Sequence, residues 1–297
     1  MNIYQHIASN KQKTYLMMFV FILLAAGVAY LFGEASGYGS SIVGVALVIS
    51  GFTSFASYYW SDKIILSLSH ARPADPKRDF DFFTVAENIA IAAGLPKPKL
   101  YVIDDPSPNA FATGRDPKHA VIVATTGLLQ RLERSEIEGV IAHEMAHVQN
   151  YDIRMMSVVA VLSGVIVLIT DIFMRQLWWG GMRNRDNNRG GGIILALSIL
   201  AAILAPIVAT LIKLAVSRRR EFLADASGAY LTRNPGELAS ALEKISADPQ
   251  PLRSASSATA HLYIENPFKV TKSKNWYVSM FNTHPPVEER IKRLKSM

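Results

Sequence analysis

The sequence predicts a mainly α-helical membrane protein with one small β-sheet in its soluble part. Half of the 297 residues are hydrophobic, and they concentrate in four long blocks. Lys and Arg residues cluster beside these blocks, as at Arg218–Arg220, and only three short segments between the blocks resemble strands. The net charge of +7 would suit nucleic acid or an anionic bilayer surface. The placement of the basic residues favours the lipid bilayer as partner, and we expect no nucleic acid.

The first two apolar blocks, Tyr15–Phe32 and Ile42–Trp60, are each long enough to cross a bilayer as a helix. Lys11 and Lys13 precede the pair and further basic residues follow it, whereas the segment between the blocks has no Lys or Arg. The positive-inside rule then places the N-terminus and everything after the second block in the cytoplasm. The first block is too long for a cleavable signal, so we expect a retained anchor. Two buried core helices are the alternative, but these blocks are almost free of charge.

Residues 62–156 have the pattern of a soluble domain. Phe80–Ala93 carries apolar residues at helical spacing and is followed by Gly94, which indicates a helix. Ser135 is the expected N-cap of a helix over Glu136–Gln149, with acidic residues in its first turn. Short strands are predicted at Leu100–Ile103, Asn109–Thr113 and His119–Ala124.

A second pair of apolar blocks, Val158–Met174 and Ile193–Val216, predicts another transmembrane hairpin. The intervening segment Arg175–Gly192 carries four arginines, which favour the cytoplasm, although two crossings would place it outside. From Arg218 onward we expect a soluble, mainly helical tail. It contains a helix that begins at Asn234 or Pro235 and runs to about Ala247, and a mobile loop at Asp248–Thr259. The expected division is a first hairpin, a soluble half with the histidine-rich helix, a second hairpin and a soluble C-terminal half: 1–61, 62–156, 157–217 and 218–297.

His143, Glu144 and His147 form the pattern H-E-x-x-H on the predicted helix Glu136–Gln149. Residues four apart lie on one helix face, so both imidazoles can bind one ion at about 2 Å. Glu144 is placed to take a proton from a water molecule that the ion activates. The chain has no cysteine, so nitrogen and oxygen must hold the metal, and we expect one Zn²⁺ per chain. The plainer alternative is an amphipathic helix with two solvated histidines.

A catalytic zinc site usually has a third protein ligand and one open position. Glu221 and Asp225 lie one turn apart on a predicted helix that follows the fourth apolar block. Such a pair suits one carboxylate on the metal and a second that accepts a hydrogen bond from a ligand histidine. The spacing leaves open the alternative that both are surface acids beside Arg218–Arg220.

Four motifs occur together: P-N-A-F-A-T-G at 108–114, H-E-M-A-H at 143–147, S-R-R-R-E-F-L-A-D at 217–225 and T-H-P-P at 283–286. With these motifs and its order of apolar blocks, the chain resembles the HtpX-type membrane zinc metalloproteases, which are related to the CAAX prenyl proteases. The resemblance implies a gluzincin-type (α+β) metalloprotease domain in which Glu221 is the third zinc ligand. It also implies a stress-response protease of the inner membrane that cleaves misfolded membrane proteins at the cytoplasmic face.

Two further site assignments concern residues outside the metal ligands. By resemblance, His284 would donate a hydrogen bond to the oxyanion formed during cleavage, and the alternative is a histidine packed near Arg290. An edge strand made of Asn109, Ala110, Phe111 and Ala112 would bind the substrate backbone, or would be a plain structural strand. We expect His261 to be incidental, and Asn150 and Asp152 to cap a helix or form ion pairs.

Two other functions fit parts of the sequence. A peptidase dedicated to trimming a modified C-terminus would be favoured by seven apolar blocks, whereas this chain has four. A non-enzymatic metal-binding membrane scaffold would have no need of Glu144. The sequence therefore favours a zinc-dependent endopeptidase.

Overall fold

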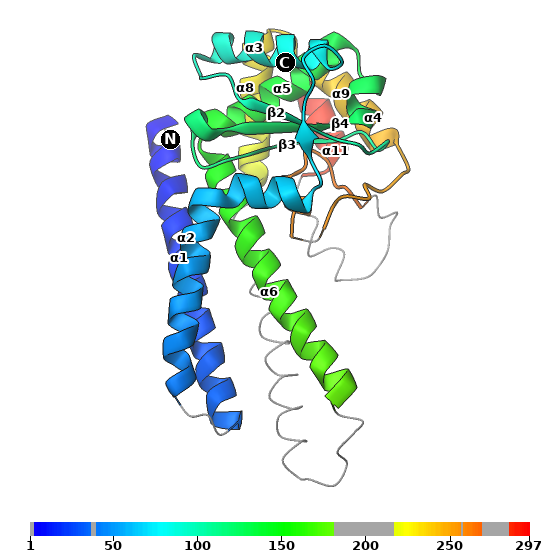
Figure 1. Ribbon diagram of the computed structural model, residues 1–297. Helices are drawn as coiled ribbons and strands as arrows, with labels where there is room; N and C mark the ends of the chain where they lie inside the picture. Colours follow the sequence, from blue (N-terminus) through cyan, green and yellow to red (C-terminus); the bar gives the residue numbers. More distant parts are fainter. Residues whose placement is uncertain (1–2, 37–39, 181–216, 257, 269–284) are drawn as a thin grey trace.

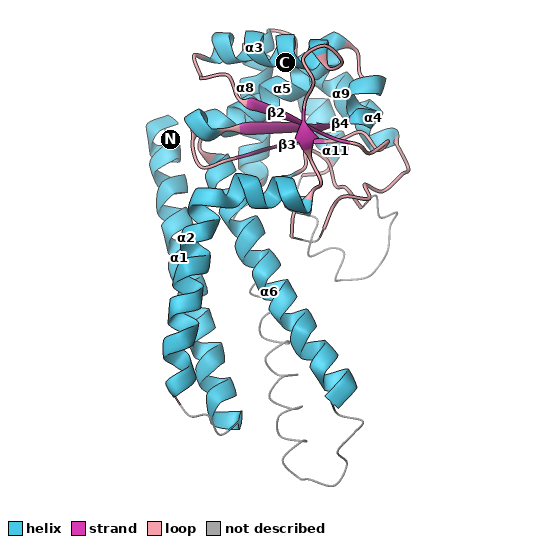
Figure 2. Ribbon diagram, viewed as in Figure 1, coloured by secondary structure: helices cyan, strands magenta, loops and turns pink. Residues whose placement is uncertain are grey.

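The computed structural model describes residues 3–36, 40–180, 217–256, 258–268 and 285–297. Helices cover a small sheet at one end of the molecule, and long helices project away from it (Figure 1). Most of the described chain is helical, and its strands form one small mixed sheet, which confirms the predicted fold class (Figure 2). The predicted fourth apolar block and His284 lie outside the described residues.

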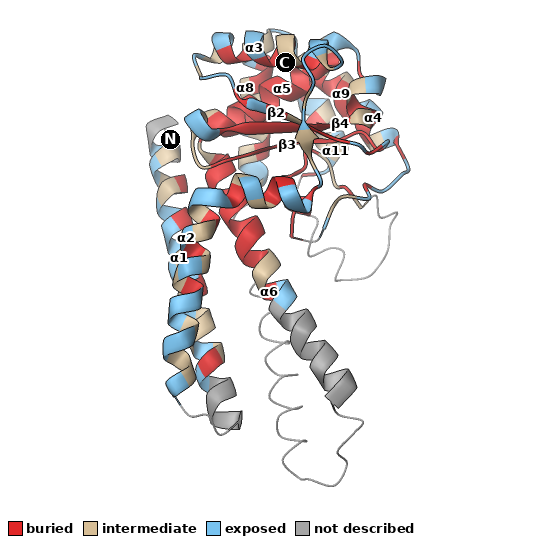
Figure 3. Ribbon diagram, in the orientation of Figure 1, coloured by how far each residue is buried: buried red, intermediate tan, exposed pale blue. Residues whose placement is uncertain are grey.

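Two of the described helices are long and apolar enough to cross a membrane. Helix α1 (Ile3–Ser36) contains the candidate span Ile7–Tyr30, and α2 (Ser41–Leu68) packs along it. Large apolar side chains on both helices face outward, unlike those around the sheet (Figure 3). An exposed apolar surface of this extent suits a lipid environment. Both helices of the predicted first hairpin are therefore present.

Helix α2 bends at Trp60, where φ is −124° and ψ is 15°. The second span was predicted to end at this residue, and α2 continues beyond it across the foot of the soluble part (Figure 1). Arg115 donates a hydrogen bond of 3.1 Å to the carbonyl oxygen of Tyr59, and its guanidinium lies 5.5 Å from the centre of that ring. Arg154 lies 5.3 Å from the ring centre of Tyr58. The aromatic residues that end the span thus contact cations of the soluble part.

The described strands form a four-stranded sheet in the order β1-β2-β4-β3. Strands β2 (Lys99–Ile103) and β4 (Val121–Thr125) are parallel, whereas β1 (Arg72–Pro73) and β3 (Ala110–Thr113) are antiparallel to their neighbours. Strand β4 begins two residues later than predicted because a short 3₁₀ turn, η1 (Pro117–His119), precedes it. Asp116 caps this turn by accepting the backbone N–H of His119 at 3.0 Å.

The sheet separates two apolar cores. Ile122 and Ala124 of β4 face a core shared with α3 (Phe80–Ala93), α4 (Thr126–Arg131), α5 (Arg134–Gln149), α8 (Arg218–Thr232), α9 (Pro235–Ala247) and α11 (Val287–Leu294). Val121 and Val123 face the other core, with Phe111 of β3 and the ends of α2 and α6. This alternation confirms the prediction that Val121 and Val123 share one face.

Helix α6 (Asp152–Gly180) contains the third predicted block. Its first turns are buried in the second core, so the block begins inside the protein. Helix α5 and the part of α6 up to Leu168 resemble a span only when taken as one pair, and that pair is bent by 85°. This bend places the start of α6 below the end of α5.

The segment predicted as a mobile loop lies against the end of the sheet. In its described residues, Leu252 is buried and the backbone N–H of Arg253 donates to the Asp105 carboxylate at 2.9 Å. It leads into a second 3₁₀ turn, η2 (Ala260–Leu262), where His261 is buried and donates from Nε2 to the carbonyl oxygen of Met156 at 3.1 Å. This hydrogen bond joins η2 to α6, so His261 has a structural contact in the fold.

Candidate metal centre

Helix α5, which carries the H-E-x-x-H pattern, begins at Arg134. Its N-cap is Glu133, which forms a reciprocal capping box with Glu136, and the Glu136 carboxylate accepts the backbone N–H of Glu133 at 2.8 Å. Ser135 was predicted as the N-cap, but it lies inside the helix and donates its hydroxyl to Glu237 at 2.8 Å. The prediction was wrong because a capping box of two glutamates replaces the hydroxyl cap.

Helix α8 approaches α5 closely enough to bring Glu221 to the two histidines. A Cβ atom at Gly228 would lie 2.9 Å from the backbone nitrogen of His143, so only glycine allows this approach. Glu221 lies two helical turns before Gly228. The backbones of α5 and α8 are therefore in contact beside the first histidine, and the first turn of α8 reaches the second.

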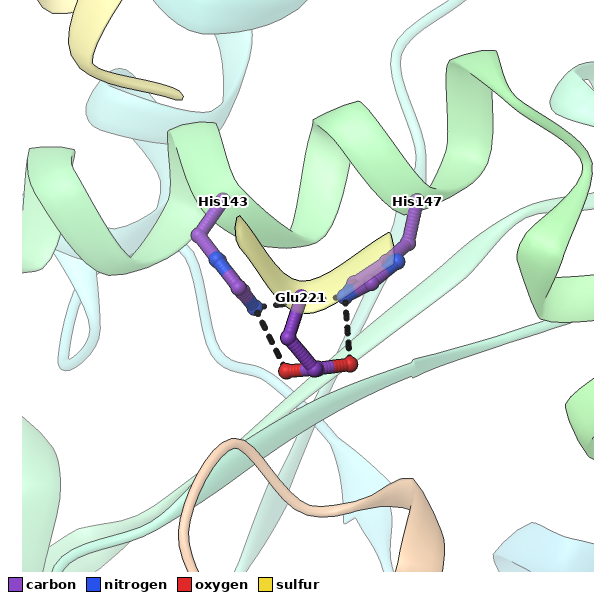
Figure 4. A group of neighbouring side chains, drawn as sticks. All are labelled: His143, His147 and Glu221. Atoms are coloured by element: carbon purple, nitrogen blue, oxygen red, sulfur yellow. Dashed lines mark hydrogen bonds and ion pairs between the residues drawn. The ribbon is translucent and has the colours of Figure 1, made fainter. Parts of the chain in front are cut away.

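The side chains of His143, His147 and Glu221 converge on one point (Figure 4). The two Nε2 atoms lie 3.2 Å apart, and the Glu221 carboxylate oxygens lie 3.8 Å from Nε2 of His143 and 3.5 Å from Nε2 of His147. Tetrahedral ligand atoms that hold zinc at about 2 Å lie roughly 3.3 Å from one another. The observed separations therefore fit a zinc ion with small adjustments, and three protein ligands leave one coordination position open.

A carboxylate holds the second ring nitrogen of each histidine. Nδ1 of His143 lies 2.9 Å from Asp225, and Nδ1 of His147 lies 3.0 Å from Asp152. A hydrogen bond from Nδ1–H to a carboxylate leaves Nε2 as the free lone pair, which is the tautomer a metal ligand needs. Both rings are therefore oriented with Nε2 toward Glu221.

The electrostatics of the site distinguish its two histidines. Burial lowers the pKa of His143, even though Asp225 opposes this effect, so its neutral form is favoured. Burial also lowers the pKa of His147, but the Asp152 hydrogen bond and the charges of Glu221 and Glu144 outweigh it and raise the pKa to about 9. A metal binding at His147 would therefore displace a proton.

Glu144 is buried beside the ligands. Burial and the nearby Glu221 charge raise the pKa of Glu144 to about 7, against the opposing effects of His147 and Arg290. Its carboxylate also accepts the backbone N–H of Ala112 on β3. A carboxylate with a pKa near neutrality, beside a candidate metal site, is suited to proton transfer at physiological pH.

Known proteins are similar to this chain in sequence and in fold. Residues 76–297 match peptidase family M48. The chain belongs to peptidase family M48. Its relatives include the proteases described as HtpX homologues of Caldanaerobacter subterraneus subsp. tengcongensis and Thermoanaerobacter pseudethanolicus. They are 50% and 45% identical to it, and each alignment covers 99% of this chain and 98% of the relative.

The crystal structure of Ste24p from S. mikatae has a similar fold. Its TM-score is 0.51 with 19% sequence identity, and the match covers 98% of this chain and 67% of that one. Family membership and the two candidate spans make this M48 chain a membrane metalloprotease, as the sequence predicted.

The sequence did not reveal the role of Arg290 in this M48 site. Arg290 is fully buried, donates two hydrogen bonds to Asp225 and one of 2.8 Å to the carbonyl oxygen of Ile264. It holds the pKa of Asp225 at about 2, although burial alone would raise it. An arginine among other charged residues of a short C-terminal helix carries no sequence signal of burial.

Asp152 was expected to cap a helix or form an ion pair, and it does lie in the first turn of α6, 3.5 Å from Arg220. Its hydrogen bond with His147 was missed. Tyr151 adopts a left-handed conformation with φ of 59°, which turns the chain back and brings Asp152 beneath the histidine. Gly and Asn are the residues that usually adopt this conformation, so a tyrosine at this position does not predict the turn.

The predicted substrate strand is an edge strand of the sheet in the described residues. The backbone N–H of Thr125 donates to the carbonyl oxygen of Asn109 at 3.0 Å. Ala110 and Ala112, which are one and three residues further on, therefore direct their backbone groups away from β4. Ala112 donates to Glu144, and the carbonyl oxygen of Ala110 accepts the N–H of Ile264 at 2.9 Å. The backbone N–H of Ala110 donates to Oδ1 of Asn109 at 3.0 Å. The edge of β3 that faces away from β4 thus runs past the candidate base, and most of its backbone groups already have partners within the chain.

Proposed function

We propose that this chain is a zinc-dependent endopeptidase that cleaves misfolded or damaged membrane proteins at the cytoplasmic face of the inner membrane. One observation carries the proposal: two imidazoles and a carboxylate converge at 3.2–3.8 Å, and Glu144 lies beside them, hydrogen-bonded to the edge strand β3. This cleavage activity would be part of membrane protein quality control during stress.

His143, His147 and Glu221 would hold one zinc ion, with Asp225 and Asp152 orienting the two rings. The ion would act as a Lewis acid that activates water and stabilises the negative charge developing on the peptide carbonyl. Glu144 takes the proton from the attacking water and passes it to the leaving amine, because its pKa lies close to neutrality. Burial of Glu144 excludes competing solvent from this transfer.

The substrate would lie along the edge of β3 that faces away from β4 and pair with the backbone of Ala110 and Ala112. Backbone pairing reads no side chain, so it suits an enzyme that accepts unfolded segments of many sequences. The backbone of Ala110 already bonds to Ile264 and to the side chain of Asn109, and the N–H of Ala112 bonds to Glu144. A substrate that pairs with these two residues would displace those contacts. A peptide substrate with N-methyl groups on alternate residues tests this pairing. Methylation in one of the two possible phases should slow cleavage, and equal rates in both phases would contradict it.

His284 is proposed to donate a hydrogen bond to the oxyanion of the tetrahedral intermediate. The variant His284→Ala should then lower kcat and leave the zinc content unchanged. A lower melting temperature with normal kcat would instead assign His284 a packing role.

The charge distribution around the first hairpin supports an active site at the cytoplasmic face of the membrane. A protease so placed would meet the cytoplasmic segments of membrane proteins. The direct test is digestion of a detergent-solubilised membrane substrate and of casein, with and without a chelator. We expect cleavage that stops with chelator, returns with zinc and is absent in Glu144→Gln. Cleavage insensitive to the chelator would refute the metal mechanism.

A further inference from the structure

Asn10 is a buried polar residue of α1, the helix that carries the first candidate span. Its side-chain nitrogen donates to Oδ1 of Asp152 at 2.7 Å and to the carbonyl oxygen of Asn150 at 3.0 Å. Its side-chain oxygen accepts from Nη1 of Arg220 at 3.4 Å. Two acceptors on one side and a donor on the other determine the orientation of the amide. An asparagine here therefore matches all three neighbours.

These neighbours come from segments distant in sequence that meet beneath the metal site. Asn150 is the C-cap residue of α5, and its carbonyl group lies at the point where α5 and α6 meet at 85°. Asp152 begins α6, and its other carboxylate oxygen, Oδ2, bonds to His147. Arg220 directly precedes Glu221 on α8. Asn10 is thus hydrogen-bonded to Asp152, which orients His147. It is also hydrogen-bonded to Arg220, the neighbour of Glu221 in the sequence.

The bend between α5 and α6 includes a backbone conformation that costs conformational energy. Tyr151 has a φ of 59°, which is uncommon for a residue with a large side chain. A helix end leaves backbone carbonyl groups without helical partners, and Asn10 supplies one of them with a donor. The same amide holds Asp152, so Asn10 stabilises the bend and the aspartate with a single side chain.

We propose that Asn10 is a positioning residue for the metal site, through which the N-terminal membrane helix helps to orient His147. The inference rests on the proposed function, because it assumes that His143, His147 and Glu221 hold the metal. Asn10 does not touch the ligands: it holds Asp152, and Asp152 holds His147. Helix α1 is then part of the architecture of the active site as well as a membrane anchor.

The exchange of Asn10 and Asp152 tests this relationship sharply, because the two side chains have the same shape. Asn10→Asp places two carboxylates against each other, and Asp152→Asn removes the charge from the partner of His147. In the double variant Asn10→Asp/Asp152→Asn, a donor and a carboxylate again face each other in reversed order. The side chain in Asp152→Asn could still accept from His147, and that in Asn10→Asp could still accept from Arg220, while the carbonyl of Asn150 loses its donor.

The measurements use the full-length chain in detergent. Zinc affinity is determined by competition with a chromogenic chelator, and the visible absorption of the Co²⁺-substituted protein reports on ligand geometry. We expect Asn10→Ala and Asn10→Asp to weaken zinc binding several-fold, up to about tenfold, and to change the Co²⁺ spectrum. The double variant should lose less affinity than the product of its two single losses. Thr14→Val is the matched control: Thr14 is buried one turn further on α1 and bonds only to the carbonyl of Asn10 among the contacts described, so zinc affinity should stay unchanged.

Wild-type zinc affinity and an unchanged Co²⁺ spectrum in Asn10→Ala would overturn the inference, as would strictly multiplicative losses in the double variant. If Asn10→Ala does not fold, Asn10→Ser replaces it and the exchange of the two side chains still decides. A different result would contradict the proposed function. In that case the wild-type chain binds no zinc, or His143→Ala binds zinc as tightly as the wild type does.

Discussion

Arg290 grips Asp225 with two hydrogen bonds, from Nε to Oδ2 at 2.9 Å and from Nη2 to Oδ1 at 2.7 Å. The same Oδ1 lies 2.9 Å from Nδ1 of His143, so the arginine orients the carboxylate that orients the histidine. The Arg290 side chain is 0% exposed. Removing one member of a buried ion pair leaves an uncompensated charge, which costs more than the pair itself contributes.

Arg290→Met should therefore destabilise the protein by on the order of 3–5 kcal/mol and weaken zinc binding. Arg290→Lys keeps the charge but loses the two-pronged geometry, so it should fall between Met and wild type. Thermal unfolding in detergent and zinc titration measure both effects. Lys292→Met is the control, because Lys292 is exposed on the same helix. Equal behaviour of the Arg290 and Lys292 variants would contradict the buried role.

Glu221→Ala should lose the metal, because only two protein ligands would remain. Asp225→Ala and Asp152→Ala should keep a metal but bind it on the order of 10–100-fold more weakly, since each leaves the three ligands in place and removes the carboxylate that orients one ring. Elemental analysis of the purified variants and chelator competition separate the two classes. Full zinc occupancy in Glu221→Ala would place the third ligand elsewhere.

Glu144→Gln should bind zinc as the wild type does and lose at least about 100-fold in kcat, because the proton acceptor is gone while the ligands remain. Zinc content and peptide turnover are measured on the same preparation. Glu138→Gln is the control, since Glu138 lies on the same helix outside the site. Turnover equal to the wild type in Glu144→Gln would sink the assigned mechanism.

The Glu136 carboxylate joins the start of α5 to α9, with hydrogen bonds from Ser240 at 2.6 Å and from Lys244 at 2.7 Å. Burial tends to raise the pKa of Glu136, but Lys244, Ser240 and the N–H of Glu133 outweigh it and lower the pKa below its usual value. A lowered folded pKa stabilises the protein above the unfolded pKa near 4.3, and this stabilisation is lost as pH falls through the folded value.

At neutral pH, Glu136→Gln should lower the melting temperature by roughly 3–8 °C. The difference from wild type should shrink as the pH falls from about 4.3 through the lower folded pKa, below which the wild-type carboxylate is protonated as well. Glu87→Gln, which disrupts an exposed pair with Lys97, should change the melting temperature little at any pH. A difference for Glu136→Gln that stays constant across this pH range would refute the electrostatic explanation.

The orientation of the chain can be tested with single cysteines, because the protein has none of its own. A cysteine at Ser40, between the first two spans, should react with an impermeant reagent in intact cells, and one at Glu87 should react only after lysis. A cysteine at Asn187, in the predicted outer segment of the second hairpin, should behave as at Ser40. Protection of Asn187 with labelling of Ser40 would leave two true spans and refute the second hairpin.

The sequence by itself was sufficient for features that depend on local spacing. Apolar blocks of the required length predicted α1 and α2, and the spacing of His143 and His147 placed both rings on one helix face. The one-turn spacing of Glu221 and Asp225 suggested a ligand and its supporting acid, and it left open that both are surface acids. Alternation along β4 separated Val121 and Val123 from Ile122 and Ala124.

Only the tertiary structure decided which distant groups complete the site. Asn10, Asp152 and Arg290 come from three different helices, and each contact depends on how those helices pack. The approach of α8 to α5 at Gly228, the left-handed turn at Tyr151 and the burial of Arg290 have no periodic signature. Periodicity reports which face of one helix is apolar, whereas a hydrogen bond between two helices depends on their relative placement, which the whole packed core determines.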